Sequence, residues 1–181
     1  MENFNLIVST GREFETQAKS ELWFNLLSIG DESPIIFSSE ISGLVLGYTN
    51  KNPRELVYYL RNVMENLDLN YTQTIKKIYP VDQVVLTDLD LIKKKSLELI
   101  KNHPYCKEGT EFRISIRKRK TELETNEIIN AIADNVKYPV NLQEFDWKLQ
   151  LEIIGNYTGI GILKKKDIFS PVSKRRELMD Q

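Results

Sequence analysis

Residues 111–120, EFRISIRKRK, constrain the fold of this chain most, because apolar and polar side chains alternate along them. The alternation has the two-residue period of a β-strand. One face carries Phe112, Ile114 and Ile116, and the other carries Arg113, Ser115, Arg117 and Arg119. The apolar face must be buried in a core, whereas guanidinium groups are suited to the anionic oxygens of phosphate. The stretch predicts a sheet with one basic face and favours nucleic acid as a partner. A solvated strand face without a ligand is the alternative.

The length of 181 residues allows one large domain or two small ones. No apolar run approaches the roughly 20 residues that span a bilayer. Charged side chains also interrupt the first 20 residues, where a secretory signal would be apolar. We therefore expect a cytoplasmic protein that has no membrane partner. The single cysteine, Cys106, excludes an intrachain disulfide and fits a reducing compartment.

Charge is unevenly distributed along the chain, although the net charge is only −1. Residues 1–75 hold 5 Lys and Arg against 10 Asp and Glu, whereas residues 76–181 hold 20 against 16. Binding of a polyanion depends on where cations lie and not on their sum. The distribution predicts that a polyanion-binding surface lies mainly in the second half of the chain.

The first 79 residues have the periodicities of two helices and four strands. Residues 4–9 predict a strand and residues 13–29 a helix, followed by strands at 35–37 and 43–48, a helix at 53–66 and a strand at 71–79. Asn52 and Pro53 stand where a helix N-cap and first-turn proline belong. The order βαββαβ is that of a ferredoxin-like domain.

The rest of the chain predicts a second α+β domain over residues 88–170. Residues 80–87 are predicted to be a linker, and residues 171–181 a basic C-terminal tail. Within the domain, helices are predicted at 89–101 and from about 121 to 136, and strands at 111–120, 147–154 and 159–163. The predicted order is αβαββ.

The second half resembles a THUMP domain, the RNA-binding module of several tRNA modification enzymes. The resemblance lies in four stretches: EFRISIRKR (111–119), NEIINAIADNV (126–136), YPVNLQEFDWKLQLEIIG (138–155) and TGIGILKK (158–165). Asn141 stands where many members of the family have Asp. The first half looks like the ferredoxin-like domain that usually precedes THUMP, and FNLIVSTGREFETQAKSEL (4–22) is similar to the opening of the stand-alone THUMP proteins required for tRNA cytidine acetylation.

This resemblance implies an adaptor that has no cofactor of its own. It would hold the acceptor end of tRNA while a separate acetyltransferase, using acetyl-CoA and ATP, forms 4-acetylcytidine. A subunit serving a tRNA thiolation or methylation enzyme is the alternative. The expected RNA-binding residues are Arg113, Arg117, Lys118, Arg119, Lys120, Lys164, Lys165, Lys166 and Arg12. Lys118 and Lys120 point away from the arginines if the strand persists that far.

The sequence contains little that predicts catalysis. His103 is the single histidine, which excludes pairs of histidines at a metal and most schemes with a histidine base. Neither a Gly-x-Gly-x-x-Gly stretch nor a P-loop is present. We therefore predict no catalytic residue, metal or cofactor. A small ferredoxin-like phosphohydrolase is the remaining enzyme hypothesis, since residues 10–12 (Thr-Gly-Arg) lie between a strand and a helix where a phosphate can bind.

Overall fold

A computed structural model describes residues 3–66, 71 and 74–179. The chain divides into two compact units. Unit 1 contains residues 3–80 and 166–181, and unit 2 contains residues 81–165.

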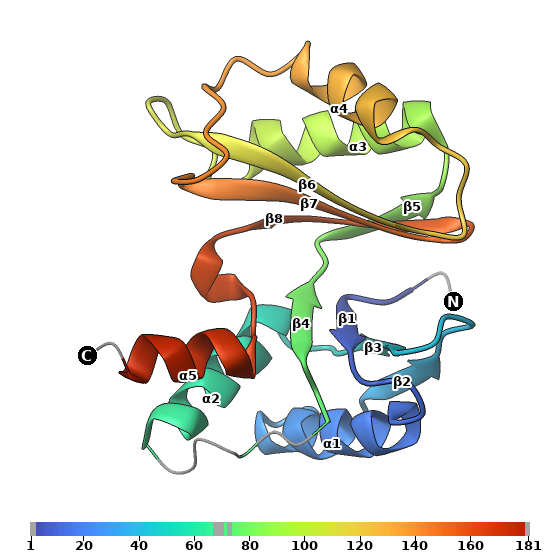
Figure 1. Cartoon of the computed structure of the whole chain (residues 1–181), viewed down its shortest axis with the longest axis vertical. Helices are drawn as coiled ribbons and strands as arrows, with labels where there is room; N and C mark the ends of the chain where they lie inside the picture. The colour runs from blue at the N-terminus through green and yellow to red at the C-terminus, as the bar shows by residue number, and fades with distance from the viewer. Residues whose placement is uncertain (1–2, 67–70, 72–73, 180–181) are drawn as a thin grey trace. The chain divides into compact units, whose positions relative to one another are not determined.

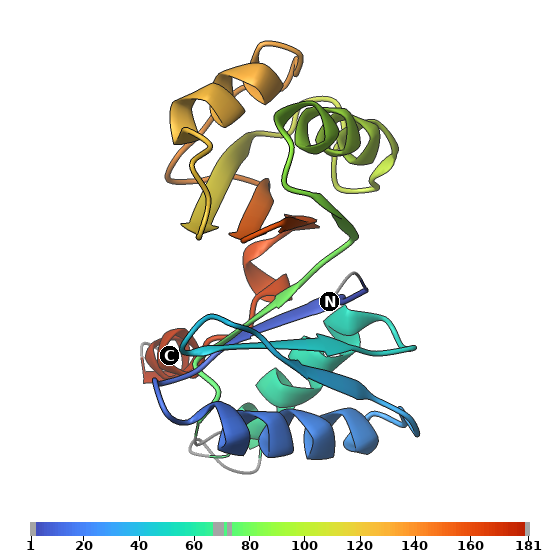
Figure 2. The same cartoon turned by 90° about the vertical axis from the view of Figure 1, so that its right-hand side faces the viewer.

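Unit 1 is a four-stranded antiparallel sheet with the strand order β2-β3-β1-β4 (Figures 1 and 2). Its elements are β1 (Leu6–Ser9), α1 (Glu15–Ser28), β2 (Ile35–Ser38), β3 (Leu44–Tyr48), α2 (Pro53–Asn66) and β4 (Lys77–Pro80). This order confirms the predicted ferredoxin-like arrangement. The strand predicted at 71–79 is shorter than expected and begins at Lys77; residues 72 and 73 lie outside the described part of the chain.

The apolar faces of α1 and α2 form the core of unit 1. Leu22 and Leu26 of α1 and Leu60 of α2 are fully buried, together with Val8 and Val45 of the sheet. Asn52 caps α2, because its Oδ1 accepts a hydrogen bond from the Arg54 N–H at 3.0 Å. The helix therefore begins where the Asn-Pro pair predicted.

Residues 166–181 return to unit 1, whereas residues 88–170 were predicted as one domain and 171–181 as a tail. Phe169 is fully buried in the unit 1 core, and its N–H and C=O both bond to the backbone of Ile78. After it, α5 (Pro171–Met179) packs on α2. The expected boundaries therefore differ from those of the structure, because a buried aromatic side chain and two sheet-like hydrogen bonds hold this segment.

Because residues 166–181 belong to unit 1, the charges of the two units differ from those of the two halves of the sequence. Unit 1 holds 11 Lys and Arg against 12 Asp and Glu, and unit 2 holds 14 against 13. The acidic and basic halves of the sequence are thus not an acidic and a basic unit in the structure. Any basic binding surface must be a local arrangement of side chains.

Lys174 of α5 is buried, with 4% of its side chain exposed, and forms an ion pair with Glu65 of α2. The hydrogen bond from Lys174 holds the pKa of Glu65 below its ordinary value of 4.5. A carboxyl group with a lowered pKa in the folded state stabilises that state above its ordinary pKa, and this contribution is lost as the pH falls.

We therefore expect the attachment of α5 to weaken as the pH falls below 4.5. Proteolysis of residues 171–179 should become faster relative to that of residues 89–102 in the same sample. Glu65→Gln should already show the faster cleavage at pH 7 and should change less with pH. An identical pH response in Glu65→Gln and the wild type would contradict this role of Glu65.

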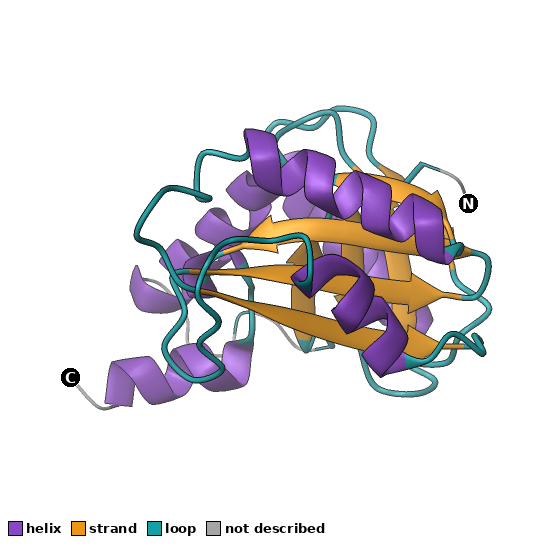
Figure 3. Cartoon of the chain, turned by 90° about the horizontal axis from the view of Figure 1, so that it is seen from above, coloured by secondary structure: helices purple, strands orange, loops and turns teal. Residues whose placement is uncertain are grey.

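Unit 2 has a sheet with the strand order β5-β8-β7-β6, in which β6 and β7 are parallel and the other neighbours are antiparallel. Its elements are β5 (Gln83–Leu86), α3 (Leu89–Asn102), β6 (Phe112–Arg119), α4 (Thr125–Ala133), β7 (Trp147–Ile154) and β8 (Tyr157–Leu163). Both helices lie on one face of the sheet (Figures 1 and 3). The α+β class is confirmed, with the order βαβαββ in this unit.

The additional strand, β5, occupies most of the predicted linker at 80–87. Val84 and Val85 pair antiparallel with Gly159 and Thr158 of β8. The Asp82 carboxylate accepts a hydrogen bond from the Ile162 N–H at 2.8 Å. The sequence around these residues indicated only a polar connection. The strand could not be recognised locally, because its partner strand lies more than 70 residues later in the chain.

Trp147 lies at the centre of the unit 2 core and is fully buried. Its ring stacks on Phe112 at a centroid distance of 4.9 Å and meets Tyr138 edge-on at 5.4 Å. Its indole N–H donates to the Thr110 hydroxyl at 2.9 Å. These contacts fix the start of β6 to the start of β7 and thereby align the opposite, polar face of the two strands.

No helix in the described residues is long and apolar enough to cross a bilayer.

Candidate nucleic-acid interface

The register between β6 and β7 gathers the cations of two strands on the sheet face opposite the helices. Arg113 pairs with Lys148, and Arg117 pairs with Glu152 four residues further along. Successive side chains of a strand point to opposite faces, so Arg113, Arg117 and Arg119 share one face with Lys148. These four residues are called the basic face below.

One end of the basic face combines cations with an aromatic ring. The Arg113 guanidinium lies 5.3 Å from the centroid of the Phe145 ring, and the Lys165 ammonium lies 5.5 Å from the same centroid. Arg113 also donates to the Leu142 carbonyl at 3.0 Å, which fixes its side chain. Phe145 is half-buried and therefore presents part of its surface to solvent. Two cations of distant segments thus share one aromatic side chain.

A second cation–aromatic pair lies in the same unit, where Lys164 Nζ is 4.7 Å from the centroid of the Tyr105 ring. Lys164 and Lys165 directly follow Leu163, which pairs with Lys148, the neighbour of Arg113. The end of β8 therefore meets the start of β6 and β7. Arg113, Lys148, Lys164 and Lys165, with Phe145 and Tyr105, are called the aromatic end below. Cations beside aromatic rings suit a nucleic acid that has both phosphates and unpaired bases.

The other end of the basic face contains a carboxylate. Arg119 Nη1 is 2.8 Å from Glu152 Oε2, and Arg117 Nε is 4.0 Å from Glu152 Oε1. Gln150 donates to Glu152 Oε1 at 2.8 Å. Burial raises the pKa of Glu152, and the hydrogen bond and charge of Arg119 oppose that rise. The two arginines therefore share one buried countercharge.

The remaining predicted residues lie elsewhere. Lys118 lies on the opposite face of β6, as the alternation indicated, and donates to the Leu123 carbonyl at 2.7 Å. Lys120 is exposed and has a left-handed backbone (φ 54°) in the loop after β6. Arg12 is exposed in unit 1, and Lys166, also in unit 1, lies 5.9 Å from the centroid of Tyr58. The structure thus places Arg113, Arg117 and Arg119 on one face of β6 and brings Lys165 to the Phe145 ring beside Arg113, whereas Lys164 contacts Tyr105.

Sequence reasoning did not select three members of the aromatic end: Lys148, Phe145 and Tyr105. Lys148 begins an alternating strand and so had a detectable polar position. Its importance depends on the parallel pairing of β7 with β6, which no local pattern indicates. Phe145 and Tyr105 lie in loops, where neither period applies.

The loop proposed for phosphate in the phosphohydrolase hypothesis already holds a carboxylate. Glu15, in the first turn of α1, accepts hydrogen bonds from the Gly43 N–H and the Ser42 hydroxyl. The bond from Gly43 is the main cause of the lowered pKa of Glu15, and the Glu15 N–H itself contributes. An anion of the chain therefore stands at the helix N-terminus, where a phosphate would bind.

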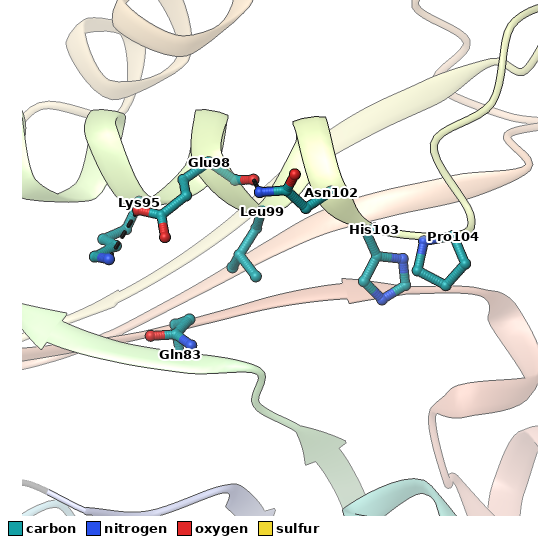
Figure 4. A pocket seen from close by; sticks show the side chains of 7 residues that line it. All are labelled: Gln83, Lys95, Glu98, Leu99, Asn102, His103 and Pro104. Carbon is teal, nitrogen blue, oxygen red and sulfur yellow. Dashed lines mark hydrogen bonds and ion pairs between the residues drawn. The ribbon is translucent and has the colours of Figure 1, made fainter.

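A shallow pocket of about 150 Å³ lies between α3 and β5 in unit 2 (Figure 4). Its lining residues are Gln83, Lys95, Glu98, Leu99, Asn102, His103 and Pro104. Lys95 and Glu98 form an ion pair at 2.8 Å, and His103 Nδ1 accepts a hydrogen bond from the Tyr105 N–H at 3.2 Å. The pocket therefore offers neither a nucleophile beside a base nor a ligand set.

Cys106 lies near this region but is not suited to nucleophilic chemistry. Burial raises the pKa of its thiol to about 12, so that the thiol stays protonated at neutral pH. Within the described residues, no group of three or more His, Cys, Asp and Glu side chains is placed to hold a metal ion.

Comparison with known proteins identifies the part of the chain that carries the basic face. Residues 87–163 match the family model of the THUMP domain. A search of curated proteins found no match.

Three solved structures share the fold. PH1313 from Pyrococcus horikoshii Ot3 has a TM-score of 0.66 at 20% identity, over 90% of this chain and 55% of that one. TrmN from Thermus thermophilus has a TM-score of 0.59 at 14% identity, over 87% and 44%. A 4-thiouridine synthetase, solved in complex with RNA and with bound ATP, has a TM-score of 0.54 at 15% identity, over 93% and 42%. The chain thus spans about half the length of the chains that it matches.

Proposed function

We propose that this chain, in which residues 87–163 match the family model of the THUMP domain, binds tRNA through its aromatic end and presents the acceptor end to a tRNA modification enzyme. The juxtaposition of Arg113 and Lys165 at the Phe145 ring, with Lys148 opposite Arg113 in the register, carries the proposal. Cations that follow a sheet supply contacts to the phosphate backbone, which fix orientation. Aromatic rings beside them supply stacking for bases that are not in a duplex, such as those of a single-stranded 3′ end.

The fold comparison supports RNA as the ligand, because the similar 4-thiouridine synthetase was solved in complex with RNA. The chain is proposed to act as a non-catalytic adaptor in the cytoplasm, without a cofactor of its own. The absence of a nucleophile or base constellation in the pocket beside His103 favours binding over turnover.

The proposed partner is a separate tRNA cytidine acetyltransferase that binds acetyl-CoA and ATP and forms 4-acetylcytidine. The similarity of residues 4–22 to the stand-alone THUMP proteins supports this choice. A subunit of a tRNA thiolation enzyme is the second candidate, favoured by the fold shared with the 4-thiouridine synthetase.

The first test is tRNA binding at several salt concentrations. Intact tRNA, tRNA without its single-stranded 3′ end, and a duplex of equal length are compared. We expect the affinity to fall in the order intact tRNA, trimmed tRNA, duplex, with a linear decrease of log K against log salt. Equal affinity for all three would contradict capture of the acceptor end, and absence of binding would refute the proposal.

Arg113→Ala and Lys148→Ala should each weaken binding of intact tRNA. Each should also reduce the slope of log K against log salt by about 0.7–0.9, the value for one phosphate contact. Lys118→Ala is the matched control, because Lys118 lies on the same strand with the same charge but on the opposite face. Equal losses in Lys118→Ala and Arg113→Ala would show attraction by general charge and not by the basic face.

The identity of the partner enzyme is tested by measuring modification of tRNA. The chain alone is expected to modify no tRNA, whereas addition of the acetyltransferase, acetyl-CoA and ATP should yield 4-acetylcytidine detectable by mass spectrometry. Thiolation by a sulfur-transfer enzyme that depends on the chain would instead select the second candidate.

A further inference from the structure

We propose that the outer face of α1 and the free edge of β2, both in unit 1, bind a second copy of this chain across a two-fold axis. This surface is called the α1–β2 surface below. It shares no residue with the basic face, so the inference does not depend on the proposed function.

The exposed positions of α1 carry no charge. They are Thr16, Gln17, Ser20, Trp23, Phe24 and Ser28. The charged side chains of α1 are half-buried, and each bonds to another segment of unit 1. Every other α-helix in the described part of the chain exposes at least one charged side chain, such as Glu55 of α2 or Lys94 of α3. Surfaces that face water ordinarily carry charges, whereas the centres of protein–protein interfaces lack them and are rich in aromatic residues. The composition of this helix face is therefore that of an interface.

The shape of the surface is suited to contact with itself. Trp23 and Phe24 are 40% and 63% exposed, and their rings meet edge-on at a centroid distance of 5.1 Å. Beside them lies a shallow hollow of about 390 Å³, lined by Lys19, Ser20, Trp23, Phe24 and Ile36. In a two-fold contact the same patch serves both copies, so a ring of each copy can enter the hollow of the other.

The strand next to this helix face can add a second contact. β2 lies at the end of the sheet, and β3 is its only strand neighbour among the described residues. α1 packs on β2 and β3 and runs antiparallel to β2 (Figure 2): Lys19, near the start of α1, donates to the Ser38 hydroxyl at the end of β2 at 3.0 Å. A free strand edge readily pairs with another strand. Antiparallel pairing of β2 with β2 of a second copy has a two-fold axis and would bring the two α1 helices side by side.

Charges of both signs lie at the two ends of β2: Lys19, Glu15 and Glu40 at its end, and Lys51, Asp31 and Glu32 at its start. Antiparallel pairing brings the end of one β2 to the start of the other. A lysine of each copy would then lie near carboxylates of its partner, which favours this register. The surface offers no excess of cations to a polyanion, so RNA is not the occupant that it fits.

The exposed area predicts the strength of the contact. An aromatic side chain has about 150–250 Å² of surface, so Trp23 and Phe24 together expose roughly 200 Å² per copy. This is about a third of the roughly 600 Å² that each partner contributes to the smallest specific interfaces. The polar positions of α1 and the edge of β2 add to it. We therefore expect a dimer that dissociates on dilution.

Sedimentation of the full chain over a range of concentrations, without RNA, tests the inference. The mean mass should rise from one copy to two, and the Trp23 emission should shift to shorter wavelength as the dimer forms, since Trp147 is already buried. Phe24→Glu should raise the dissociation constant of the dimer at least about 30-fold and abolish the shift. Leu91→Glu is the matched control, because it adds the same charge at an exposed apolar position of α3 and should dimerise as the wild type does.

Ser20→Arg is a second test, because it fills the hollow and keeps both rings. It should weaken the dimer while circular dichroism stays as in the wild type. A mass of one copy at every concentration would overturn the inference, and so would a dimer that Phe24→Glu weakens no more than Leu91→Glu does. A shift of Trp23 emission caused by a different protein, in a chain that stays monomeric, would assign the surface to that protein and would also overturn it. Failure of tRNA binding would refute the proposed function and leave this result unchanged.

Discussion

Trp147→Ala is expected to destabilise unit 2 by about 3–5 kcal/mol, the usual cost of removing a fully buried tryptophan. The indole stacks on Phe112, packs against Tyr138 and donates to Thr110, so that its loss leaves a cavity and an unpaired hydroxyl partner. Because Phe112 and Trp147 open β6 and β7, the basic face should lose its alignment and tRNA binding should be lost with it.

The two tryptophans of the chain allow the unfolding of the two units to be followed by fluorescence. Trp23 lies on α1 in unit 1, and Trp147 lies in unit 2. In Trp147→Ala, the remaining Trp23 signal should report an unfolding transition of unit 1 close to that of the wild type, while circular dichroism should show early loss of structure. Trp23→Ala is the control, because 40% of that side chain is exposed, and it should cost about 1 kcal/mol or less. If circular dichroism showed the same first unfolding transition in Trp147→Ala as in the wild type, this account of the unit 2 core would be contradicted.

Phe169→Ala is expected to destabilise unit 1 by a similar amount, about 3–5 kcal/mol. Phe169 is fully buried among residues of α1, α2 and the sheet, although it follows all of unit 2 in sequence. Its loss should detach residues 171–179 and remove the contact of α5 with α2. Trypsin should then cleave at Lys174, Arg175 and Arg176 under conditions in which the wild type resists.

Val172→Ala is the matched control for Phe169→Ala. Val172 lies three residues further along the same segment but is 56% exposed, so its truncation should change stability by less than about 0.5 kcal/mol. Equal cleavage rates in Phe169→Ala and the wild type would mean that the segment is held by α5 alone. The ion pair of Lys174 with Glu65 would then be the main attachment.

Local patterns were sufficient for most elements. The helices at Pro53–Asn66 and Leu89–Asn102 and the strand at Trp147–Ile154 lie where their periodicities indicated. Each of these elements carries its own signal, namely a cap, a proline or an alternation, within about 15 residues. The strand β5 carried a weak signal, because a four-residue edge strand is defined by its partner β8 and not by its own pattern.

The residues of the candidate site also divide into those with a local sequence pattern and those defined by a distant partner. Arg113, Arg117 and Arg119 could be assigned to one strand face from the sequence, because their alternation lies within one strand. Lys148, Phe145 and Glu152 were not selected, because each matters only through a residue on another strand or loop. The role of the C-terminal cations was also misread: Lys174 belongs to a buried ion pair and not to a basic tail.

The sequence by itself determined that this chain forms a βαββαβ domain followed by a second α+β domain, and that one strand presents a row of arginines. Periodicity dictates these features, because burial of apolar side chains follows the local geometry of helix and strand. The tertiary structure alone decided which of those arginines has an anionic partner. Strand register is a contact between residues far apart in the chain, and it placed Glu152 beside Arg117 and Lys148 beside Arg113.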